Sequence, residues 1–475
     1  MLYQGKEILM GEQYDIAFLG GGPAGYQGAI RAAQLGAKVA VVEEKFVGGV
    51  CLNWGCIPTK AVRASAEVGR SMRRAREYGF KPVEALPDMA AIIARKQRVV
   101  KALRGSIEQL FHARRIDLIE GRGALVGPGK IEVQKASETD LVQAGKMVIA
   151  TGSRPAGLPV FPKNQRIFLA DEMLDISYLP ANLLVVGGGA VGVEMAAIFR
   201  ELGSEVTLVE ALDFILPYDD REMAGNLLTL LRRRKIKVYT GTTVKSVVES
   251  VNGFSVLLSN GIEVVPDTIL LAIGRLPNTE GIGIENLGIR TERGFILADG
   301  HLGTNLPGHY AAGDVIGGWL LAHVAFAEGI CAAEHAMGME ESWMNYRTVP
   351  RCVFSIPEYA AVGVSEEEAQ ANKCPIKVAR FPFKSLGMAQ AIGEIDGQVK
   401  IITHAKSGRI LGAHILGPQG ADLISEIALA MKAGLPVRSI METIHTHPTL
   451  SEAVLEVAQA LHGQAIHSPP ERGAS

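Results

Sequence analysis

One pattern of hydrophobic and polar positions near the start of the chain predicts a strand, a helix and a second strand. Tyr14 to Leu19 and Lys38 to Val42 are short, almost continuous apolar runs, and Tyr26 to Leu35 between them has the composition of a helix. Buried parallel strands show such runs, and their alternation with helices is typical of a doubly wound α/β sheet. The pattern therefore predicts a Rossmann-like unit.

The same pattern occurs again in the middle of the chain. Leu183 to Val186 predicts a strand, Val193 to Leu202 a helix and Glu205 to Val209 the next strand. Repetition of a whole strand–helix–strand unit indicates two domains of one kind. The chain is thus expected to contain two dinucleotide-binding folds.

A glycine-rich turn lies between the first strand and the helix in both units. Its spacing is G-x-G-x-x-G, and an acid follows 18 positions after the third glycine; these residues are Gly20, Gly22, Gly25 and Glu43, then Gly187, Gly189, Gly192 and Glu210. Glycines let backbone N–H groups approach a pyrophosphate at the helix N-terminus, and the carboxylate can accept hydrogen bonds from ribose hydroxyls. Two bound dinucleotides are predicted. An empty unit is the alternative for either copy, and the spacing alone does not identify the nucleotide.

The rest of the chain predicts further strands and a different C-terminal domain. Buried strands that end in small-residue turns are expected at 148–152 and 270–275, and a strand that ends in an acid at 304–314. From Val349 onward, alternating apolar residues predict antiparallel strands at 353–356, 360–364, 376–383 and 399–403. Gly420 to Gly434 has a helical apolar stripe that fits packing on this sheet or on a partner.

The composition describes a large globular chain of balanced charge. It has 475 residues, 54 of them glycine, with 48% hydrophobic residues and a formal charge of −2. A chain this long exceeds one hydrophobic core, so three or four domains are expected. The charge argues against a nucleic-acid partner, and Arg73–Arg74 with Arg76 and Arg232 to Lys235 are expected to be solvated helix faces. No apolar run is long enough for a membrane helix, so no membrane partner is predicted.

Two cysteines with four residues between them, Cys51 and Cys56, follow the first nucleotide-binding pattern. Pro58 favours the first turn of a helix, so Cys56 is expected at a helix N-terminus. The helix dipole there raises the thiolate fraction, which is only about 3% at pH 7 for a thiol with a pKa near 8.5. The pair is a candidate redox centre. Two buried structural cysteines are the alternative, and a zinc site is disfavoured because no second pair of ligands lies nearby.

The cysteine count and the first residues both bear on the compartment. Five cysteines are too few for a disulfide framework in this length, so any disulfide is expected to be catalytic and the compartment reducing. Met1 to Gln13 contains Glu7 and Glu12, no arginine and no apolar core, and matches neither a secretory signal nor a transit peptide. A cytoplasmic location is therefore expected.

Two longer motifs resemble one enzyme family over nearly the whole chain. Residues 48–60 match G-G-x-C-L-N-x-G-C-I-P-S/T-K, and residues 445–452 match H-x-H-P-T-L-S-E. Both are shared by the flavin-dependent pyridine nucleotide–disulfide oxidoreductases, and the chain is most similar to their dihydrolipoamide dehydrogenase branch. The resemblance implies an α/β protein with an FAD domain at 1–152, an NAD domain at 153–277, a central domain at 278–348 and an α+β dimerisation domain at 349–475.

The resemblance also implies which residues hold the two cofactors. The first glycine motif with Glu43 would hold the adenosine end of FAD, and Asp314 would bind the ribityl chain. Further FAD contacts are expected at Lys60, Thr151, Gly152 and Ala322. The second motif with Glu210, together with Gly274, would hold NAD. An acid at this place repels a 2′-phosphate, and no arginine lies between Glu210 and Arg221, so NAD is favoured over NADP.

The redox residues are implied in the same way. Cys51 would exchange with the substrate and Cys56 would lie against the flavin. The resemblance implies an ion pair of Lys60 and Glu194 near the flavin ring. A solvated helix residue and a surface acid are the alternatives, although Glu194 is expected on a mostly apolar helix, where a charge needs a partner. No metal is expected.

His447 resembles the acid–base histidine of the family, with Glu452 orienting its imidazole. That histidine comes from the opposite subunit in the family, which implies a homodimer. Thr449-x-x-Glu452 is also a capping box, so Glu452 is expected to serve helix formation alone or in addition. His445 is expected to be structural.

The implied reaction oxidises protein-bound dihydrolipoamide and reduces NAD, with a lipoylated carrier of a 2-oxoacid dehydrogenase or glycine cleavage complex as partner. Another disulfide substrate, or a flavoprotein subunit with mainly a binding role, is the alternative. Two family positions differ here: Met388 replaces a common arginine, and Ile356 a common histidine. Both lie in the expected interface domain and leave the redox pair untouched.

Overall fold

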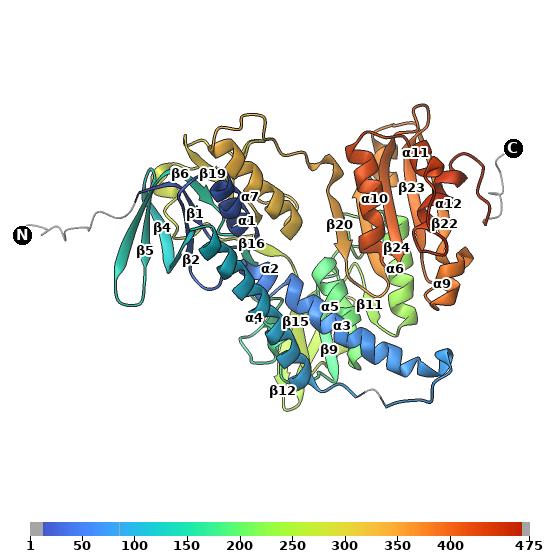
Figure 1. Cartoon of the computed structure of the whole chain (residues 1–475). Coiled ribbons are helices and arrows are strands. Elements are labelled where there is room, and N and C mark those ends of the chain that lie inside the picture. The colour runs from blue at the N-terminus through green and yellow to red at the C-terminus, as the bar shows by residue number, and fades with distance from the viewer. Residues whose placement is uncertain (1–12, 85, 468–475) are drawn as a thin grey trace, which may run out of the picture. The chain divides into compact units, whose positions relative to one another are not determined.

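Figure 1 shows the computed structural model, which describes residues 13–84 and 86–467. The chain divides into two compact units. The first contains the described residues up to 62 together with 90–156 and 275–345, and the second contains 63–89, 157–274 and the described residues from 346 onward. None of the described helices is long and apolar enough to cross a membrane. Apart from Gln13, the segment predicted to contain no targeting signal lies outside the described residues.

A seven-stranded sheet forms the centre of the first unit. Its strands are β1 (Gln13–Leu19), β2 (Val39–Glu43), β3 (Asp117–Glu120), β4 (Arg122–Gly127), β5 (Lys130–Gln134), β6 (Thr139–Ile149) and β19 (His309–Ala311). The order is β3-β2-β1-β6-β5-β4, and β19 pairs with β6. The neighbours of β1, β2 and β19 are parallel, whereas β4, β5 and β6 form antiparallel pairs. Ile16, Phe18 and Val148 are fully buried in this sheet.

Helices cover this sheet and carry the cysteine motif. They are α1 (Pro23–Gln34), α2 (Gly49–Asn53), α4 (Met89–Ala113) and α7 (Ala322–Ala336), with the start of α3 (Cys56–Arg73). Smaller elements are the ladders β7 (Ser153–Pro155) with β16 (Arg275–Pro277) and β17 (Thr291–Glu292) with β18 (Phe295–Ile296), and the 3₁₀ turns η3 (Glu285–Leu287) and η4 (Asp314–Ile316).

The second unit contains the repeated Rossmann pattern. A parallel sheet has the order β11-β10-β9-β15-β8 and is accompanied by a three-stranded antiparallel sheet. The strands are β8 (Ile167–Leu169), β9 (Asn182–Val186), β10 (Glu205–Val209), β11 (Lys237–Tyr239) and β15 (Thr268–Leu271), then β12 (Val244–Ser250), β13 (Gly253–Leu258) and β14 (Glu263–Val264). The helices are α5 (Ala190–Leu202), α6 (Arg221–Arg233) and the 3₁₀ turns η1 (Ala75–Tyr78) and η2 (Met173–Asp175).

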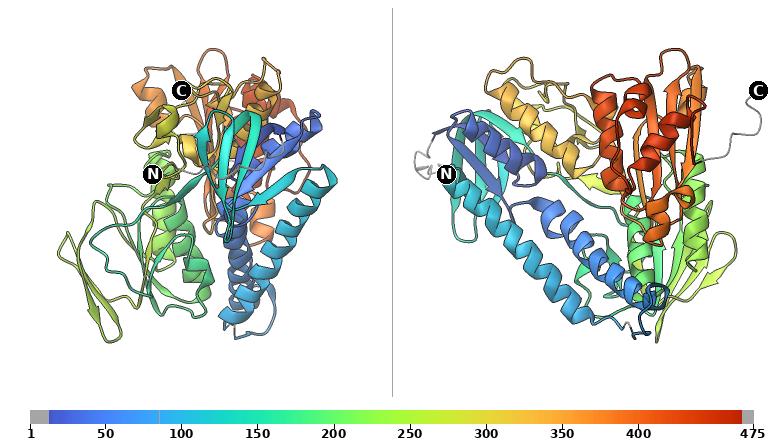
Figure 2. Two further views of the ribbon diagram at one scale, coloured as in Figure 1. Left: turned by 90° about the vertical axis from the view of Figure 1, so that its left-hand side faces the viewer. Right: turned by 45° about the vertical axis from the view of Figure 1, so that its right-hand side comes forward.

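An antiparallel sheet of order β20-β21-β24-β23-β22 completes the second unit. Figure 2 shows its strands behind a layer of C-terminal helices. The strands are β20 (Pro350–Val353), β21 (Glu358–Gly363), β22 (Ile376–Pro382), β23 (Gln398–His404) and β24 (Ile410–Gly417). The helices are α8 (Glu366–Ala371), α9 (Gly387–Ala391), α10 (Gly420–Lys432), α11 (Val437–Glu442) and α12 (Glu452–Ala460), with η5 (Tyr346–Thr348) and η6 (Phe383–Ser385).

Most predicted elements are found within a few residues, and two differ for clear reasons. The strand predicted at 353–356 ends at Val353, because the N–H of Phe354 donates to Glu194 and Pro357 has no N–H to continue the ladder. The strand predicted at 304–314 shrinks to β19, since Pro307 and Gly308 lie in a turn closed by the bond from His309 N–H to the Leu306 carbonyl.

The prediction that the arginine runs are solvated is wrong for Arg74 and Arg234, whose side chains are only 20% and 18% exposed. Arg74 pairs with Glu394, and Nη1 of Arg234 lies 2.9 Å from Oε1 of Glu201. Arg74 and Arg234 directly follow the last residues of helices α3 and α6, so their positive charges also lie at the negative ends of helix dipoles. The sequence around the arginines did not predict these ion pairs, because the acids belong to other segments of the chain. Arg76 and Arg233 are exposed as expected.

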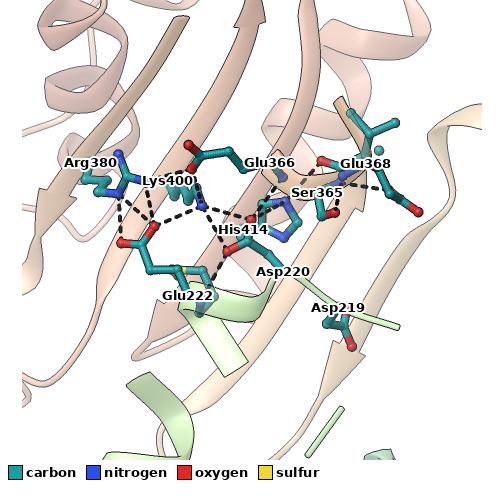
Figure 3. A network of polar contacts seen from close by, with 12 residues as sticks. Asp219, Asp220, Glu222, Ser365, Glu366, Glu368, Arg380, Lys400 and His414 are labelled. Atoms are coloured by element: carbon teal, nitrogen blue, oxygen red, sulfur yellow. Dashed lines mark hydrogen bonds and ion pairs between the residues drawn. The ribbon is translucent and has the colours of Figure 1, made fainter. Parts of the chain in front are cut away.

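A buried ionic network joins the start of α6 to the antiparallel sheet (Figure 3). Lys400 of β23 has no exposed side-chain surface, and its Nζ lies 2.8 Å from Asp220, 2.9 Å from Glu222 and 2.8 Å from Glu366. Arg380 of β22 also binds Glu222 and Glu366. Asp220 is the N-cap of α6 and accepts from the N–H of Met223. The network thus fixes the first turn of α6 onto the sheet.

Candidate active site

Cys51 and Cys56 lie in contact in the first unit. Cys51 is inside the short helix α2, and Cys56 is the first residue of α3, which confirms the predicted helix start at the second cysteine. The hydrogen bond from the Cys51 thiol to Cys56 raises the pKa of Cys51, and burial raises it further, while Lys60 opposes the shift. Cys51 thus lies in hydrogen-bond contact with the sulfur of Cys56, and Cys56 begins a helix, where the helix dipole favours negative charge.

The alternative roles of these cysteines fit the geometry less well. Both residues are only half-buried, whereas structural cysteines are usually fully buried. No cluster of three or more His, Cys, Asp or Glu side chains that could hold a metal occurs among the described residues. The partial exposure of both thiols fits a redox pair better than buried structural cysteines.

The two glycine turns have nearly identical geometry. In the first, Oε2 of Glu43 accepts from the N–H of Gly21 at 2.8 Å. In the second, Oε2 of Glu210 accepts from the N–H of Gly188 at 2.5 Å. Gly20 and Gly187 have φ of 107° and 110°, and a Cβ on either would lie 2.3 or 2.2 Å from a carbonyl oxygen of the adjoining strand end. Gly25 and Gly192 pack against the carbonyl oxygens of Gly20 and Gly187.

Both turns fit a dinucleotide. The N-terminal ends of α1 and α5 follow Gly22 and Gly189, and neither has a side-chain cap. A Cβ on Gly189 would meet no atom within 4 Å, and one on Gly22 only the Cα of Gly49 at 3.8 Å. Open space therefore lies in front of two helix N-termini whose N–H groups can bind phosphate oxygens. Each carboxylate oxygen accepts one backbone N–H, from Gly21 and Lys45 or from Gly188 and Leu212, and has a second lone pair that can accept from a ribose hydroxyl.

The other expected FAD residues cluster at the end of the first sheet. Oδ2 of Asp314 accepts from Oγ of Ser153 at 2.5 Å, and Oγ1 of Thr151 donates to the carbonyl of Asn278 at 2.7 Å. Gly152 has φ of 70° with no atom near its Cβ position, and Ala322 is the first residue of α7. Gly274, expected at the other nucleotide, has φ of 121° and equally open surroundings.

Glu328, a buried acid of α7, was not among the site residues predicted from the sequence. Its Oε2 accepts from the N–H of Gly313 at 2.7 Å and so holds the turn before Asp314. The sequence signal that could have identified it is an acid within the largely apolar helix α7.

Lys60 and Glu194 belong to different units, and their ion pair stays a prediction. Lys60 lies on α3 close enough to Cys51 to oppose the rise of that thiol's pKa. Glu194 of α5 is 8% exposed, and its Oε1 accepts from the N–H of Phe354 at 2.8 Å.

His447 and Glu452 form a dyad on the surface of the second unit. Nδ1 of His447 lies 2.8 Å from Oε1 of Glu452, and the imidazole is 77% exposed. Oε2 of Glu452 accepts from the N–H of Thr449 at 2.8 Å. Burial raises the pKa of Glu452, but the bonds from Thr449 and His447 outweigh it and leave this pKa below its usual value. The lowered pKa favours the carboxylate form of Glu452, which contacts Nδ1 of the imidazole and leaves Nε2 without this contact.

The capping box is only half formed, so the prediction that Thr449 caps the closing helix is wrong. Oγ1 of Thr449 donates to the carbonyl of Thr446, and α12 begins at Glu452 with Ser451 before it. The competing bond inside the His447 turn explains the difference. His445 bonds locally through Nδ1, which lies 2.9 Å from the Thr443 carbonyl, and its Nε2 lies 3.0 Å from Glu426 of α10. Met388 and Ile356 pack against or within the hydrophobic core.

Two family models match most of the chain. One, described as pyridine nucleotide-disulphide oxidoreductase, matches residues 14–329, and the dimerisation domain of the same family matches residues 349–458. The chain is 43% identical to a dihydrolipoyl dehydrogenase of Thermus scotoductus, covering 96% of this chain and 98% of that protein. It is 40% identical to the dihydrolipoyl dehydrogenase of Bacillus subtilis, covering 96% and 100%.

Solved structures show the same likeness. LpdA from Mycobacterium tuberculosis is 31% identical with a TM-score of 0.89, and covers 94% of this chain and 99% of its own. The HOCl-induced flavoprotein disulfide reductase RclA from Escherichia coli is 28% identical with a TM-score of 0.85, over 94% and 99%.

Proposed function

The chain belongs to the pyridine nucleotide-disulphide oxidoreductase family, and we propose that it acts as a dihydrolipoyl dehydrogenase, which oxidises a dihydrolipoyl dithiol and reduces NAD. The expected α/β fold, the family resemblance and the cofactors FAD and NAD are confirmed. The observation that carries the proposal is the hydrogen-bonded pair of Cys51 and Cys56 beside a glycine turn that fits a dinucleotide.

The cysteine pair supplies a balanced exchange. A substrate thiolate attacks the sulfur of Cys51 in the oxidised pair, the S–S bond breaks, and Cys56 leaves as a thiolate. The second substrate thiol then attacks the mixed disulfide, which releases the cyclic disulfide product and Cys51. A bound FAD would supply a two-electron acceptor for the reduced cysteine pair and a hydride donor toward NAD. We assign the adenosine end of FAD to Gly20, Gly22, Gly25 and Glu43, and NAD to Gly187, Gly189, Gly192 and Glu210.

His447 is proposed as the base that takes the proton of the substrate thiol. The imidazole of His447 is 77% exposed, and the chain carries the family's dimerisation domain at residues 349–458. We therefore propose a homodimer in which His447 and Glu452 complete the site of the partner subunit. The proposed macromolecular substrate is a lipoylated carrier protein, and the proposed location is the cytoplasm.

The proposed reaction is tested with purified protein, free dihydrolipoamide and NAD. We expect a yellow protein that reduces NAD with dihydrolipoamide and gains a long-wavelength thiolate–flavin absorption band when NADH is added. A protein that binds FAD but shows neither turnover nor this band would support the binding role instead. Candidate lipoylated domains then replace dihydrolipoamide to identify the carrier.

The Glu452→Gln variant is expected to lower dihydrolipoamide turnover about 10- to 100-fold. A neutral amide orients the imidazole less well and does not stabilise its protonated form. NADH oxidation by an artificial electron acceptor that bypasses the thiols should stay unchanged, which distinguishes a lost proton transfer from a lost fold. Equal loss in both assays would contradict the role of Glu452.

The Glu210→Ala variant is expected to raise KM for NAD about 10- to 100-fold and to reduce the preference for NAD over NADP. A carboxylate that binds ribose hydroxyls contributes about 1.5–3 kcal/mol per bond. The matched control is Glu205→Ala, which removes a 60% exposed acid from the other end of β10. If KM for NAD changes equally in both variants, Glu210 does not hold the nucleotide.

A further inference from the structure

We propose that Asn53 and Arg104 are positioning residues that fix the turn between Cys51 and Cys56 and thereby set the reduction potential of the cysteine pair. The inference rests on the proposed redox function of that pair. Asn53 stands between the two cysteines at the end of α2, and Arg104 reaches it from α4, 51 positions later in the chain.

Asn53 is a buried side chain with every polar atom in use. It is 7% exposed, and its Nδ2 donates to the carbonyls of Gly49 at 2.9 Å and Val47 at 3.1 Å, with a longer contact to Phe46 at 3.4 Å. One amide therefore joins the end of α2 to the loop that precedes it. Such a group is costly to leave unpaired, because its desolvation is already complete.

Arg104 donates to the oxygen of the Asn53 amide, and its guanidinium lies over the ring of Phe46. Its Nε and Nη2 lie 3.1 and 2.8 Å from Oδ1 of Asn53, and its guanidinium carbon lies 3.7 Å from the ring centroid of Phe46. The planar guanidinium makes both contacts at once, which a lysine ammonium cannot do. Arg104 thus clamps the two ends of the segment that runs from Phe46 to Asn53.

The clamped segment also contacts the first glycine turn. The N–H of Gly48 donates to the carbonyl of Gly21 at 2.8 Å, and a Cβ on Gly49 would lie only 2.6 Å from the Cα of Gly22. The segment that carries Cys51 therefore lies against the proposed FAD site, and the contacts of Asn53 and Arg104 hold it in this position.

A fixed turn changes the balance between disulfide and dithiol. Reduction adds two electrons and two protons, supplied by NADH or a dithiol with solvent, and converts the S–S bond into two thiols. Holding the two sulfurs close raises their effective concentration and favours the closed disulfide. Release of the turn should move the equilibrium toward the dithiol, so the pair becomes easier to reduce.

The test compares Arg104→Met with wild-type holoenzyme. The cysteine pair is equilibrated with dihydrolipoamide and lipoamide mixtures, and its oxidised fraction is followed by thiol titration and the long-wavelength band. We expect the equilibrium to move about tenfold toward the dithiol, which is about 30 mV, with FAD content unchanged. Arg104→Lys should give an intermediate shift, and Arg95→Met, which removes another arginine hydrogen bond of α4 at 2.9 Å to Ala61, should give none.

Other results would refute either the positioning role of Arg104 and Asn53 or the redox function of the cysteine pair. An unchanged potential in Arg104→Met with a lowered melting temperature would make Arg104 merely structural. If Arg104→Met loses FAD, Asn53→Asp is tested in its place. An aspartate at position 53 still accepts from Arg104 but cannot donate to the Gly49 and Val47 carbonyls. An unchanged reduction potential in Asn53→Asp would also overturn the inference. Wild-type protein with no reducible pair would instead refute the proposed function.

Discussion

Cys56→Ser should abolish NAD reduction by dihydrolipoamide, with a loss of at least about 10⁴-fold, since serine cannot form the disulfide that carries the electrons and does not ionise near neutral pH. The observed pairing of Cys51 with Cys56 makes this the largest catalytic effect expected in the chain. Initial rates with dihydrolipoamide and NAD measure it, and the visible spectrum reports whether FAD is retained.

Cys374→Ser is the matched control for this change. Cys374 is a half-buried cysteine of the second unit that belongs to no pair, so its variant should keep wild-type rates. The proposed electron path would be wrong if Cys56→Ser retained NAD-coupled turnover above a few per cent. It would also be wrong if both variants lost activity equally.

Lys400→Met is expected to have the largest effect on stability, about 3–5 kcal/mol in the opening of β23 and α6. Removal of the buried ammonium leaves the fully buried Asp220 without its lysine partner and leaves Glu222 and Glu366 with Arg380 alone. Amide hydrogen exchange of peptides from these two elements measures the change locally. Arg438→Met, which breaks an exposed pair with Glu442, should leave exchange unchanged.

The same network predicts how stability depends on pH. Burial raises the pKa of Glu222, but Arg380 and Lys400 lower it more, to about 2. Because the folded pKa is below the unfolded value near 4.3, this stabilisation is complete above about pH 4.3 and is lost as pH falls toward 2. Lys400→Met should flatten this acid dependence in the exchange of α6. A variant with wild-type exchange at every pH would contradict the buried network.

The parts that sequence predicted well are those with local physical causes. Glycine spacing determines where a strand can turn into a helix, and Pro58 favours a helix start near Cys56. Both features depend on residues close together in the chain, so the sequence predicted the glycine turns and the start of α3. The alternation of apolar residues likewise located β21, β22 and β23 to within two residues.

The parts that sequence did not predict depend on residues that are distant in the chain. Lys400 and Asp220 are 180 positions apart, and a lysine in a strand normally indicates an exposed face. The sequence does not distinguish Arg104 from other helix arginines, whereas the structure shows that it donates to the side-chain oxygen of Asn53. β24 was missed as well, because this almost completely buried strand, which includes His414, shows no alternation of apolar and polar residues.

The acids of the two glycine turns affect the kinetics of ligand capture. Glu43 and Glu210 each hold one backbone N–H of their turn and one at the start of the following loop, from Lys45 and Leu212. The loops are thus ordered before any nucleotide arrives, and little conformational entropy remains to be lost on association. Both cofactors should therefore associate in a single kinetic phase whose rate rises linearly with their concentration, without a slow isomerisation step.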